Sequence, residues 1–234
     1  MTDFKTFFSN PVFGVTLTVG TMLFFYLLFK KAKSPLLNPM IFSIAAIIAF
    51  LKLTGVPFES YENGTRILTF FLGPAIVSLA VPLYRQFDSL KANAVPILLG
   101  ITLGVAVSII SGIGLSLLLG LSREVSVSMA PKGTTSGIAM NLSSAFAGSP
   151  SMTVAFVNVA GIFGYSIGEI TLDLLKIKDP VARGVSLGTS SHIMGTRRAF
   201  EMGEKEGAMG SLSIGVAGVL TSLLMPLIIR LFGL

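Results

Sequence analysis

The chain of 234 residues lacks cysteine and tryptophan, has a single histidine and is only 12% charged. Without cysteine there is no disulfide, no thiol catalysis and no thiolate metal site. One histidine leaves no cluster of metal ligands, so we expect no metal and no other cofactor. A soluble domain carries about twice this charged fraction. Because 52% of the residues are hydrophobic, one soluble core could not bury so much apolar surface, and lipid is the expected solvent.

We therefore expect an all-α polytopic membrane protein in which residues 1–234 form a single integral membrane domain. A helix needs about 20 apolar residues to cross a bilayer, and on this basis the chain holds about eight membrane segments. They span residues 12–29, 36–53, 67–84, 94–121, 124–146, 152–175, 181–200 and 208–232. We expect a polar loop over 55–65 and a charged loop over 201–206. The net charge of +6 comes largely from bases at segment ends, which is typical of topology signals and not of nucleic-acid binding.

The segment 124–146 is broken by polar residues within an otherwise apolar stretch. Pro131 ends a helix because it lacks the N–H and its ring clashes with the preceding turn. Gly133 frees the backbone, and the hydroxyls of residues 134–136 can cap a new half-helix. The open N–H groups of such a helix start attract anions, and Lys132 adds a full positive charge. A lysine at membrane depth marks a pathway or binding site by default, although its side chain can also extend to the lipid headgroups.

The segment 181–200 is the second broken segment, and it contains the only histidine, His192, between Gly188 and Gly195. An intramembrane histidine titrates near neutral pH and can carry a coupling proton; the alternative is a polar group that is simply hydrogen-bonded. Arg197 or its neighbour can bind a carboxylate through two hydrogen bonds, or can pair with an acidic residue at helical spacing. Two broken, cationic segments favour a transporter of a small anion.

The pattern predicts three sets of functional residues. We expect the substrate to contact Lys132, Gly133, Thr134, Thr135, Thr189, Ser190, His192, Thr196 and Arg197. We expect helix breaks or gating at Gly73, Pro74, Pro131, Gly188 and Gly195. His192 and Glu169 are the candidates for proton coupling, and Glu169 can instead neutralise a buried cation. An enzyme is not expected, because a serine triad would need His192 and no nucleophile-elbow motif is present.

A weak internal repeat is visible in the spacing of glycines. Leu72-Gly73 and Leu187-Gly188 each open a broken segment and precede a charged loop and a glycine-bearing span. The pattern predicts two halves, 12–121 and 124–234, and repeated halves with discontinuous helices are typical of carriers with a site at the middle of the membrane. Glycine and proline are common in membrane helices in any case, and the spacing does not decide between a parallel and an inverted repeat.

Five stretches, in order along almost the whole chain, carry a specific combination of residues. They are Leu36-Leu-Asn-Pro39, Leu72-Gly-Pro-Ala-Ile-Val-Ser-Leu-Ala-Val-Pro-Leu-Tyr84, Pro131-Lys-Gly-Thr-Thr-Ser-Gly-Ile-Ala139, Pro180-Val-Ala-Arg-Gly-Val-Ser-Leu-Gly188 and His192-Ile-Met-Gly-Thr-Arg-Arg-Ala199. Together they resemble the LrgB/CidB family. Bacterial members of that family are described as antiholin-like or holin-like proteins linked to murein hydrolase activity and cell lysis. A similar domain occurs in the plastidial glycolate/glycerate translocator, and bacterial pairs are tied to pyruvate uptake.

The resemblance implies a multi-pass protein of the bacterial plasma (inner) membrane that transports small monocarboxylates such as glycolate, glycerate or pyruvate. It also implies a smaller membrane partner of the LrgA/CidA type, and, as the alternative function, holin-like or antiholin-like modulation of murein hydrolase activity and cell lysis. Small residues four apart, as in Gly100–Gly104, favour close helix packing, and we expect a homodimer. Two departures lie at the expected site: residues 133–137 read Gly-Thr-Thr-Ser-Gly where the family more often has Ser-Val-Thr-Thr-Pro, and Arg197 stands where a small residue is common.

Overall fold

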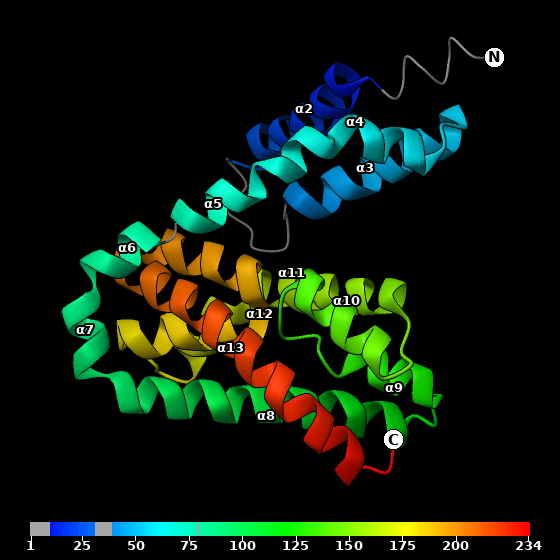
Figure 1. Cartoon of the computed structure of the whole chain (residues 1–234). Helices are drawn as coiled ribbons and strands as arrows, with labels where there is room; N and C mark the ends of the chain where they lie inside the picture. Colours follow the sequence, from blue (N-terminus) through cyan, green and yellow to red (C-terminus); the bar gives the residue numbers. More distant parts are fainter. Residues whose placement is uncertain (1–9, 31–38, 79) are drawn as a thin grey trace. The chain divides into compact units, whose positions relative to one another are not determined.

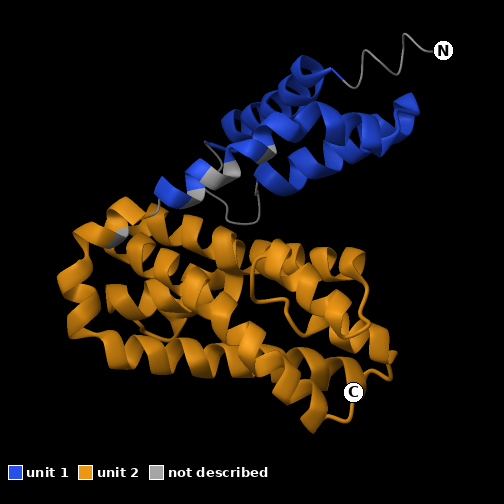
Figure 2. Cartoon of the chain, in the orientation of Figure 1, with its two compact units in different colours: residues 1–78 blue, residues 79–234 orange. Residues whose placement is uncertain are grey.

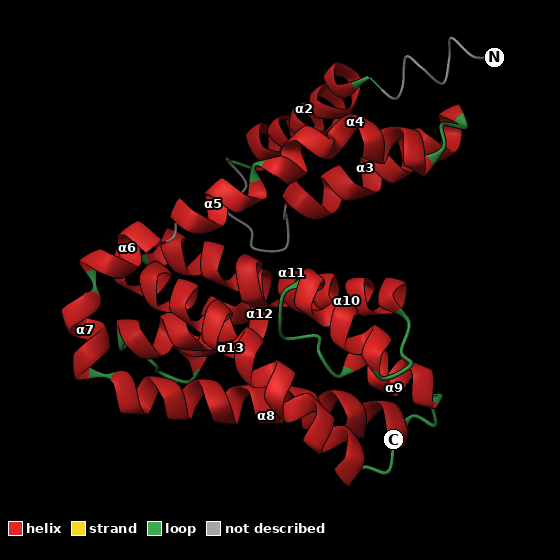
Figure 3. Ribbon diagram, in the orientation of Figure 1, coloured by secondary structure: helices red, strands yellow, loops and turns green. Residues whose placement is uncertain are grey.

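The computed structural model describes residues 10–30, 39–78 and 80–234 of the chain (Figure 1). These residues form helices joined by short turns, with no strand in the described ranges (Figure 3). The predicted all-α class is therefore confirmed. The chain consists of two compact units, residues 1–78 and residues 79–234 (Figure 2).

Unit 1 contains α2 (Pro11–Phe29), α3 (Pro39–Thr54), α4 (Phe58–Phe70) and α5 (Leu72–Ser78). The predicted spans 12–29 and 36–53 correspond to α2 and α3, and residues 36–38 lie outside the described ranges. Unit 2 contains α6 (Ala80–Arg85), α7 (Phe87–Ala92), α8 (Ala94–Leu118), α9 (Arg123–Met129), α10 (Ser136–Ala145), α11 (Pro150–Leu174), α12 (Pro180–Met202) and α13 (Glu204–Leu231). Among the described residues, four helices are long and apolar enough to cross a membrane, namely α2, α8, α11 and α13.

The prediction of a polar loop over 55–65 is wrong, because most of this stretch belongs to α4. One face of α4 packs on α2. The hydroxyl of Tyr61 lies 2.7 Å from the Thr18 hydroxyl, and Gly64 lies so close to Gly14 that a Cβ on Gly14 would come within 2.7 Å of the Gly64 carbonyl carbon. The polar residues of α4 are therefore one exposed side of a packed helix, and Gly64 serves a close helix contact and not a turn.

The predicted span 67–84 is interrupted, as expected from Gly73-Pro74. Helix α4 ends at Phe70, α5 begins at Leu72, and α6 occupies residues 80–85, so the stretch consists of short helices. The interruption falls two residues before Gly73. Pro74 lies in the first turn of α5, where a missing backbone N–H is tolerated.

The predicted charged loop 201–206 is reduced to a single residue, Gly203, between α12 and α13. Glu204 and Glu206 lie in the first turn of α13, where the positive end of the helix dipole stabilises negative side chains. Their charge therefore favours the start of a helix here.

The helices of unit 2 carry large apolar side chains on their outer faces, as a lipid environment requires. On α8, Leu103 and Val107 are more than half exposed, and Val219 and Leu223 of α13 are equally exposed. The opposite face of α8 is buried and contains isoleucine and valine interleaved with glycine and serine. Small residues on the inner face let neighbouring backbones approach closely, which is how helices associate in a membrane.

Candidate functional site

The first broken segment forms a helical hairpin, which we call hairpin 1 (residues 123–146). Its first arm is α9 and its second arm is α10, and the tip consists of the turn at residues 130–135. A guanidinium N–H of Arg123, at the start of the hairpin, donates a 3.4 Å hydrogen bond to the carbonyl of Phe146, at its end. Hairpin 1 therefore enters and leaves at the same end of the helix bundle, and its tip points away from that end. We call this end the Arg123 end.

The tip of hairpin 1 has the break that Pro131 predicts. Thr135 is the N-cap residue of α10, with extended backbone angles, but its hydroxyl makes no capping hydrogen bond. The N-cap position thus agrees with the sequence, while the capping contact does not. The first-turn N–H groups of α10 are left without a side-chain cap, which is the arrangement that favours an anion.

The second broken segment, α12, is also a hairpin, which we call hairpin 2 (residues 180–202). Its backbone leaves helical geometry at Ser191 and His192, and not at Gly188 or Gly195 as predicted. Arg183 and Arg198 both pair with Glu169. In a straight helix, residues fifteen positions apart would lie about 22 Å from one another, so the two arms must fold back side by side. Hairpin 2 therefore enters and leaves at one end of the bundle, which we call the Arg183 end.

The two glycines of hairpin 2 at which a break was predicted, Gly188 and Gly195, allow close backbone contacts. A Cβ on Gly195 would collide with the carbonyl oxygen of Leu187 in the opposite arm, and a Cβ on Gly188 would collide with the carbonyl oxygen of Gly210 on α13. These positions need glycine for space, because no side chain fits between the backbones. The break therefore lies between the two predicted glycines, which allow the backbones beside it to pack closely.

The contacts between α8 and hairpin 2 show from which end hairpin 2 enters the bundle. A Cβ on Gly100 would lie 3.8 Å from Val185, and a Cβ on Gly104 would lie 2.9 Å from the methyl group of Thr189. As α8 advances by one turn, the contact on hairpin 2 moves one turn closer to its tip. Hairpin 2 therefore runs along the first half of α8 and ends near the middle of that helix.

Hairpin 1 packs on the second half of the same helix and in the opposite sense. A Cβ on Gly133, at the tip, would lie 2.8 Å from the hydroxyl of Ser108, whereas the Ser126 hydroxyl, near the base, bonds Ser116 at 2.7 Å. The two hairpins thus enter from opposite ends, and their tips meet between Gly104 and Ser108. A Cβ on Gly133 would also lie 3.5 Å from the carbonyl oxygen of Thr189, so the tips approach one another directly.

Helix α13 crosses both hairpins in the same way. Beyond Gly210, which contacts hairpin 2, Gly218 faces hairpin 1. A Cβ on Gly218 would lie 2.7 Å from the Ile138 side chain and 3.6 Å from the Thr134 hydroxyl. The meeting point of the tips is therefore enclosed by the middle of α8 on one side and the middle of α13 on the other.

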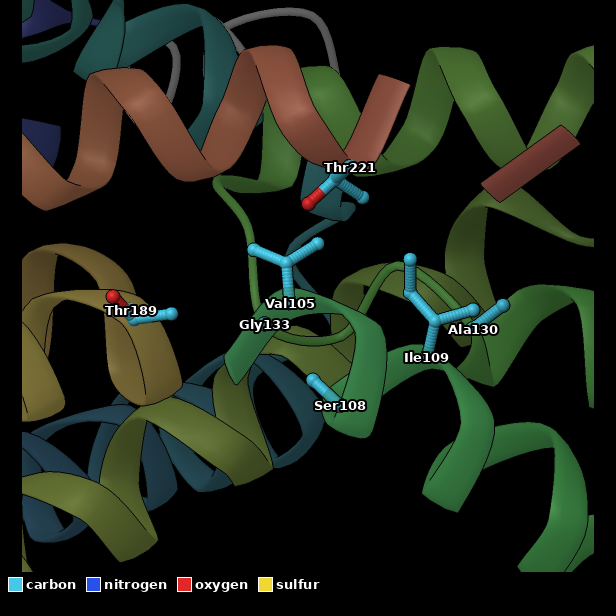
Figure 4. A pocket seen from close by; sticks show the side chains of 7 residues that line it. All are labelled: Val105, Ser108, Ile109, Ala130, Gly133, Thr189 and Thr221. Atoms are coloured by element: carbon cyan, nitrogen blue, oxygen red, sulfur yellow. The ribbon is translucent and has the colours of Figure 1, made fainter. Parts of the chain in front are cut away.

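A narrow crevice lies at this meeting point (Figure 4). It has about 180 Å³ of space between atoms, and no part of it is wide enough for a water molecule. Four elements contribute to its walls: α8, the hairpin 1 tip, hairpin 2 and α13. The lining residues are Val105, Ser108, Ile109, Ala130, Gly133, Thr189 and Thr221. The structure therefore shows the tips in a closed arrangement.

Lys132 is half-buried at the hairpin 1 tip. Its ammonium donates a 2.7 Å hydrogen bond to the carbonyl of Ser108, and Gly112 makes room for it, since a Cβ there would lie 3.0 Å from Nζ. Within the described part of the chain, no acidic side chain forms an ion pair with it. A cation in this position has one neutral partner and capacity for an anion.

Three buried threonine hydroxyls near the two tips lack hydrogen-bond partners in the described ranges. They belong to Thr134, Thr189 and Thr196, which are 2%, 5% and 3% exposed. A buried hydroxyl without a partner costs roughly 1–3 kcal/mol. Thr189 lines the crevice, and Thr134 follows the lining residue Gly133. Thr196 instead packs against Gly210 of α13.

His192 is buried and faces α11. Its backbone has a φ of 43°, a conformation that is strained for a residue with a side chain. The ring nitrogen Nε2 lies 3.0 Å from the carbonyl oxygen of Val157, and Gly161 provides the space for the ring. The exposed Ser190 borders a groove between α11 and hairpin 2 in which about 480 Å³ of space is accessible to water. His192 and Lys132 thus lie at the two tips, but their side chains contact different helices.

Arg197 and Glu169 lie at the base of hairpin 2, away from the crevice-lining residues. Arg197 is nearly half exposed, pairs with Glu201 at 3.5 Å and lies over the Tyr165 ring. Glu169 joins the two arms of the hairpin through Arg183 and Arg198. The structure therefore separates these two residues from Lys132, although the sequence pattern grouped them. Gly73 and Pro74 belong to unit 1.

Sequence reasoning missed the contributions of α8 and α13. Ser108, Gly112, Gly218 and Thr221 border the crevice or hold its walls, yet they lie in spans that read as plain apolar helices. A signal was available in α8, where Gly100, Gly104, Ser108, Gly112 and Ser116 recur at every fourth position. Such spacing places all five small residues on one helix face.

The apolar spans and the paired re-entrant hairpins define a polytopic α-helical membrane protein. The chain belongs to the LrgB-like family, whose model matches residues 18–231. It is 36% identical to the uncharacterized protein YxaC of Bacillus subtilis over 93% of this chain and 95% of that protein. It is also 36% identical to the antiholin-like protein LrgB of Bacillus subtilis, over 96% of this chain and 97% of the relative, and 34% identical to the antiholin-like protein LrgB of Bacillus cereus, over 96% and 98%. No solved structure matches the chain.

Proposed function

We propose that this protein is a secondary carrier of small monocarboxylates. The observation that supports it is the meeting of two hairpin tips beside Lys132, a half-buried cation without an acidic partner in the described residues. A carboxylate in the crevice would complete the coordination of the ammonium and could accept hydrogen bonds from the hydroxyls of Thr134 and Thr189. One cation and two neighbouring hydroxyls, beside a crevice that is closed to water in this structure, suit a small anion with a single charge, such as glycolate, glycerate or pyruvate, which would bind once the tips move apart.

The closed contact between the tips favours a carrier over a pore. A pore requires one continuous wet lumen, whereas Gly133 and Thr189 approach closely and the crevice between them is too narrow for water. Broken helices that meet at the middle of a membrane are typical of carriers that alternate access to one site. His192, at the second tip, is the candidate for proton coupling.

The names of the relatives favour a second function. Two of the relatives above are called antiholin-like, so modulation of murein hydrolase activity and cell lysis, together with a small LrgA/CidA-type membrane partner, is the alternative. We place the protein in the bacterial plasma membrane, as expected for a chain related to Bacillus proteins. Gly114 and Gly215 lie on open helix faces, and such small-residue faces support the proposal of a homodimer.

The test of the function is uptake by proteoliposomes. We expect saturable uptake of labelled glycolate, glycerate or pyruvate that a pH gradient accelerates, with weak uptake of a dicarboxylate and none of glycerol. Lys132→Ala should abolish this uptake, and Lys178→Ala is the matched control, because Lys178 is exposed in the turn between α11 and α12. Leakage of uncharged solutes graded by size would instead support the holin-like alternative and contradict a carrier.

A further inference from the structure

The tips of the two hairpins have related sequences. Residues 133–138 read Gly-Thr-Thr-Ser-Gly-Ile and residues 188–193 read Gly-Thr-Ser-Ser-His-Ile, which are identical at four of the six positions. The helix that follows each hairpin contains the same tripeptide, Val-Ala-Gly, at residues 159–161 of α11 and at residues 216–218 of α13. Two matches in the same order relate a hairpin and its following span to the next hairpin and span.

The structure makes these matching positions reciprocal. Gly161, from the first tripeptide, faces hairpin 2, and a Cβ on it would lie 2.7 Å from the His192 ring. Gly218, from the second tripeptide, faces hairpin 1, and a Cβ on it would lie 2.7 Å from Ile138. His192 and Ile138 are neighbouring positions in the alignment of the tips. Each glycine therefore provides the space for the tip of the other hairpin, as a two-fold relation requires.

The direction of the two units is opposite. Hairpin 1 begins and finishes at the Arg123 end, and α11 then runs to the Arg183 end, where Glu169 and Asp173 contact Arg183. Hairpin 2 begins and finishes at the Arg183 end, and α13 then runs back toward the Arg123 end. The two units thus have inverted topology, which relates them through an axis in the membrane plane.

We infer that residues 123–174 and 180–231 are an inverted repeat, and that its two hairpins are the two gates of one site. Hairpin 1 opens this site to the Arg123 end and hairpin 2 opens it to the Arg183 end. The inference rests on the proposed carrier function. It differs from a repeat of the halves 12–121 and 124–234, which stays a prediction, because both units except Arg123 lie within the second of those halves.

The repeat also shows where the gates differ chemically. In the alignment of the tips, Lys132 corresponds to Leu187, and His192 corresponds to Gly137. Hairpin 1 thus supplies the fixed positive charge, and hairpin 2 supplies the titratable ring. An anion released toward either end leaves past a different gate, so the two directions of transport depend on different residues.

Two engineered disulfides can lock the gates one at a time. The Cβ of Ser108 lies 3.5 Å from the Cβ that Gly133 would carry, and the Cβ of Thr189 lies 3.8 Å from the Cβ that Gly104 would carry. Both separations suit a disulfide, whose Cβ atoms are about 3.5–4.5 Å apart. The chain has no cysteine, so Thr221→Cys in the crevice wall serves as the only other thiol.

The experiment measures reaction of the Thr221→Cys thiol with a membrane-impermeant thiol reagent, added to one end at a time in oriented vesicles. With Ser108→Cys and Gly133→Cys oxidised, we expect reaction only from the Arg183 end. With Gly104→Cys and Thr189→Cys oxidised, we expect reaction only from the Arg123 end. Mass spectrometry confirms each disulfide, and Thr221→Cys without a lock should react from both ends.

Reduction is the control for folding, because it should restore reaction from both ends in the same sample. Reaction from both ends of an oxidised variant, from its locked end, or from neither end would overturn the two-gate inference. This readout needs no substrate. One-sided reaction without uptake of any carboxylate would therefore refute the proposed substrate class and leave the gates in place, and the reverse result would refute the gates alone.

Discussion

Replacing Lys132 by methionine removes the charge at the hairpin 1 tip and keeps an unbranched side chain of similar length. The ammonium donates one hydrogen bond of 2.7 Å to the Ser108 carbonyl and has no ion-pair partner in the described ranges. A hydrogen bond between an ammonium and a carboxylate contributes about 1.5–3 kcal/mol. We therefore expect the affinity for the transported monocarboxylate to fall by about 10- to 150-fold.

The fold should tolerate this change. The Ser108 carbonyl lies within α8, so loss of the lysine removes an additional charged hydrogen bond worth about 1.5–3 kcal/mol, and removal of a half-buried charge offsets part of that loss, which leaves a net change of about 1 kcal/mol. A change of 1 kcal/mol shifts the unfolding midpoint of a chain of this size by about 2–4 °C. Thermal unfolding in detergent should detect no larger shift.

The assay is isothermal titration of the purified protein with glycolate, glycerate and pyruvate. Lys178→Met is the matched control, because Lys178 is exposed and lies outside both hairpins, and it should bind like the unmodified protein. Unchanged affinity in Lys132→Met would refute the reasoning, since it would mean that the cation serves topology or packing and not the anion.

Three further predictions follow from the contacts around the tips. Gly112→Ala should destabilise the protein by about 1–3 kcal/mol, because its Cβ would lie 3.1 Å from a backbone oxygen of α9, whereas Gly20→Ala, which has nothing within 4 Å, should leave the unfolding midpoint unchanged. His192→Gln should impair uptake and remove its pH dependence between about pH 5 and 8; an unchanged profile of initial rate against pH would reduce this histidine to a packing role. Glu169→Gln should weaken the joint between the hairpin 2 arms by about 1 kcal/mol, since the ion pairs are partly exposed. Faster hydrogen exchange over residues 180–202 would show this weakening, and Asp88→Asn should have no such effect.

The breaks in the two polar segments were predictable because their causes are local. Pro131 ends a helix wherever it lies in one, and hydroxyls after a glycine predict the start of another. The fold-back of α12 was not predictable, because the contacts that accompany it come from other helices: Glu169 of α11 binds Arg183 and Arg198, and Gly210 of α13 packs on Gly188. Sequence reasoning also placed the break at glycines, whereas the strained backbone occurs at His192, where α11 holds the ring.

The polarity of a segment did not predict its backbone conformation or its packing. Residues 58–65 are polar and include an Asn-Gly pair, yet they are helical because Tyr61 and Gly64 pack on α2. Conversely, α8 reads as a uniform apolar span, and only its small residues at every fourth position show where both hairpins contact it. Tertiary contacts determine the backbone conformation of residues 58–65 and the packing face of α8. In a single sequence, such contacts are visible only through the spacing of residues along the helix.

The most direct test of a carrier with one closed site is counterflow. Proteoliposomes are loaded with unlabelled pyruvate, glycolate or glycerate and diluted into a trace of the same labelled compound, without any ion gradient. A carrier that alternates between two gates should accumulate label transiently above its equilibrium level, and Lys132→Met should lose this overshoot while Lys178→Met keeps it. Label that rises only to equilibrium in all three experiments, one with each compound inside, would contradict a carrier and favour a pore.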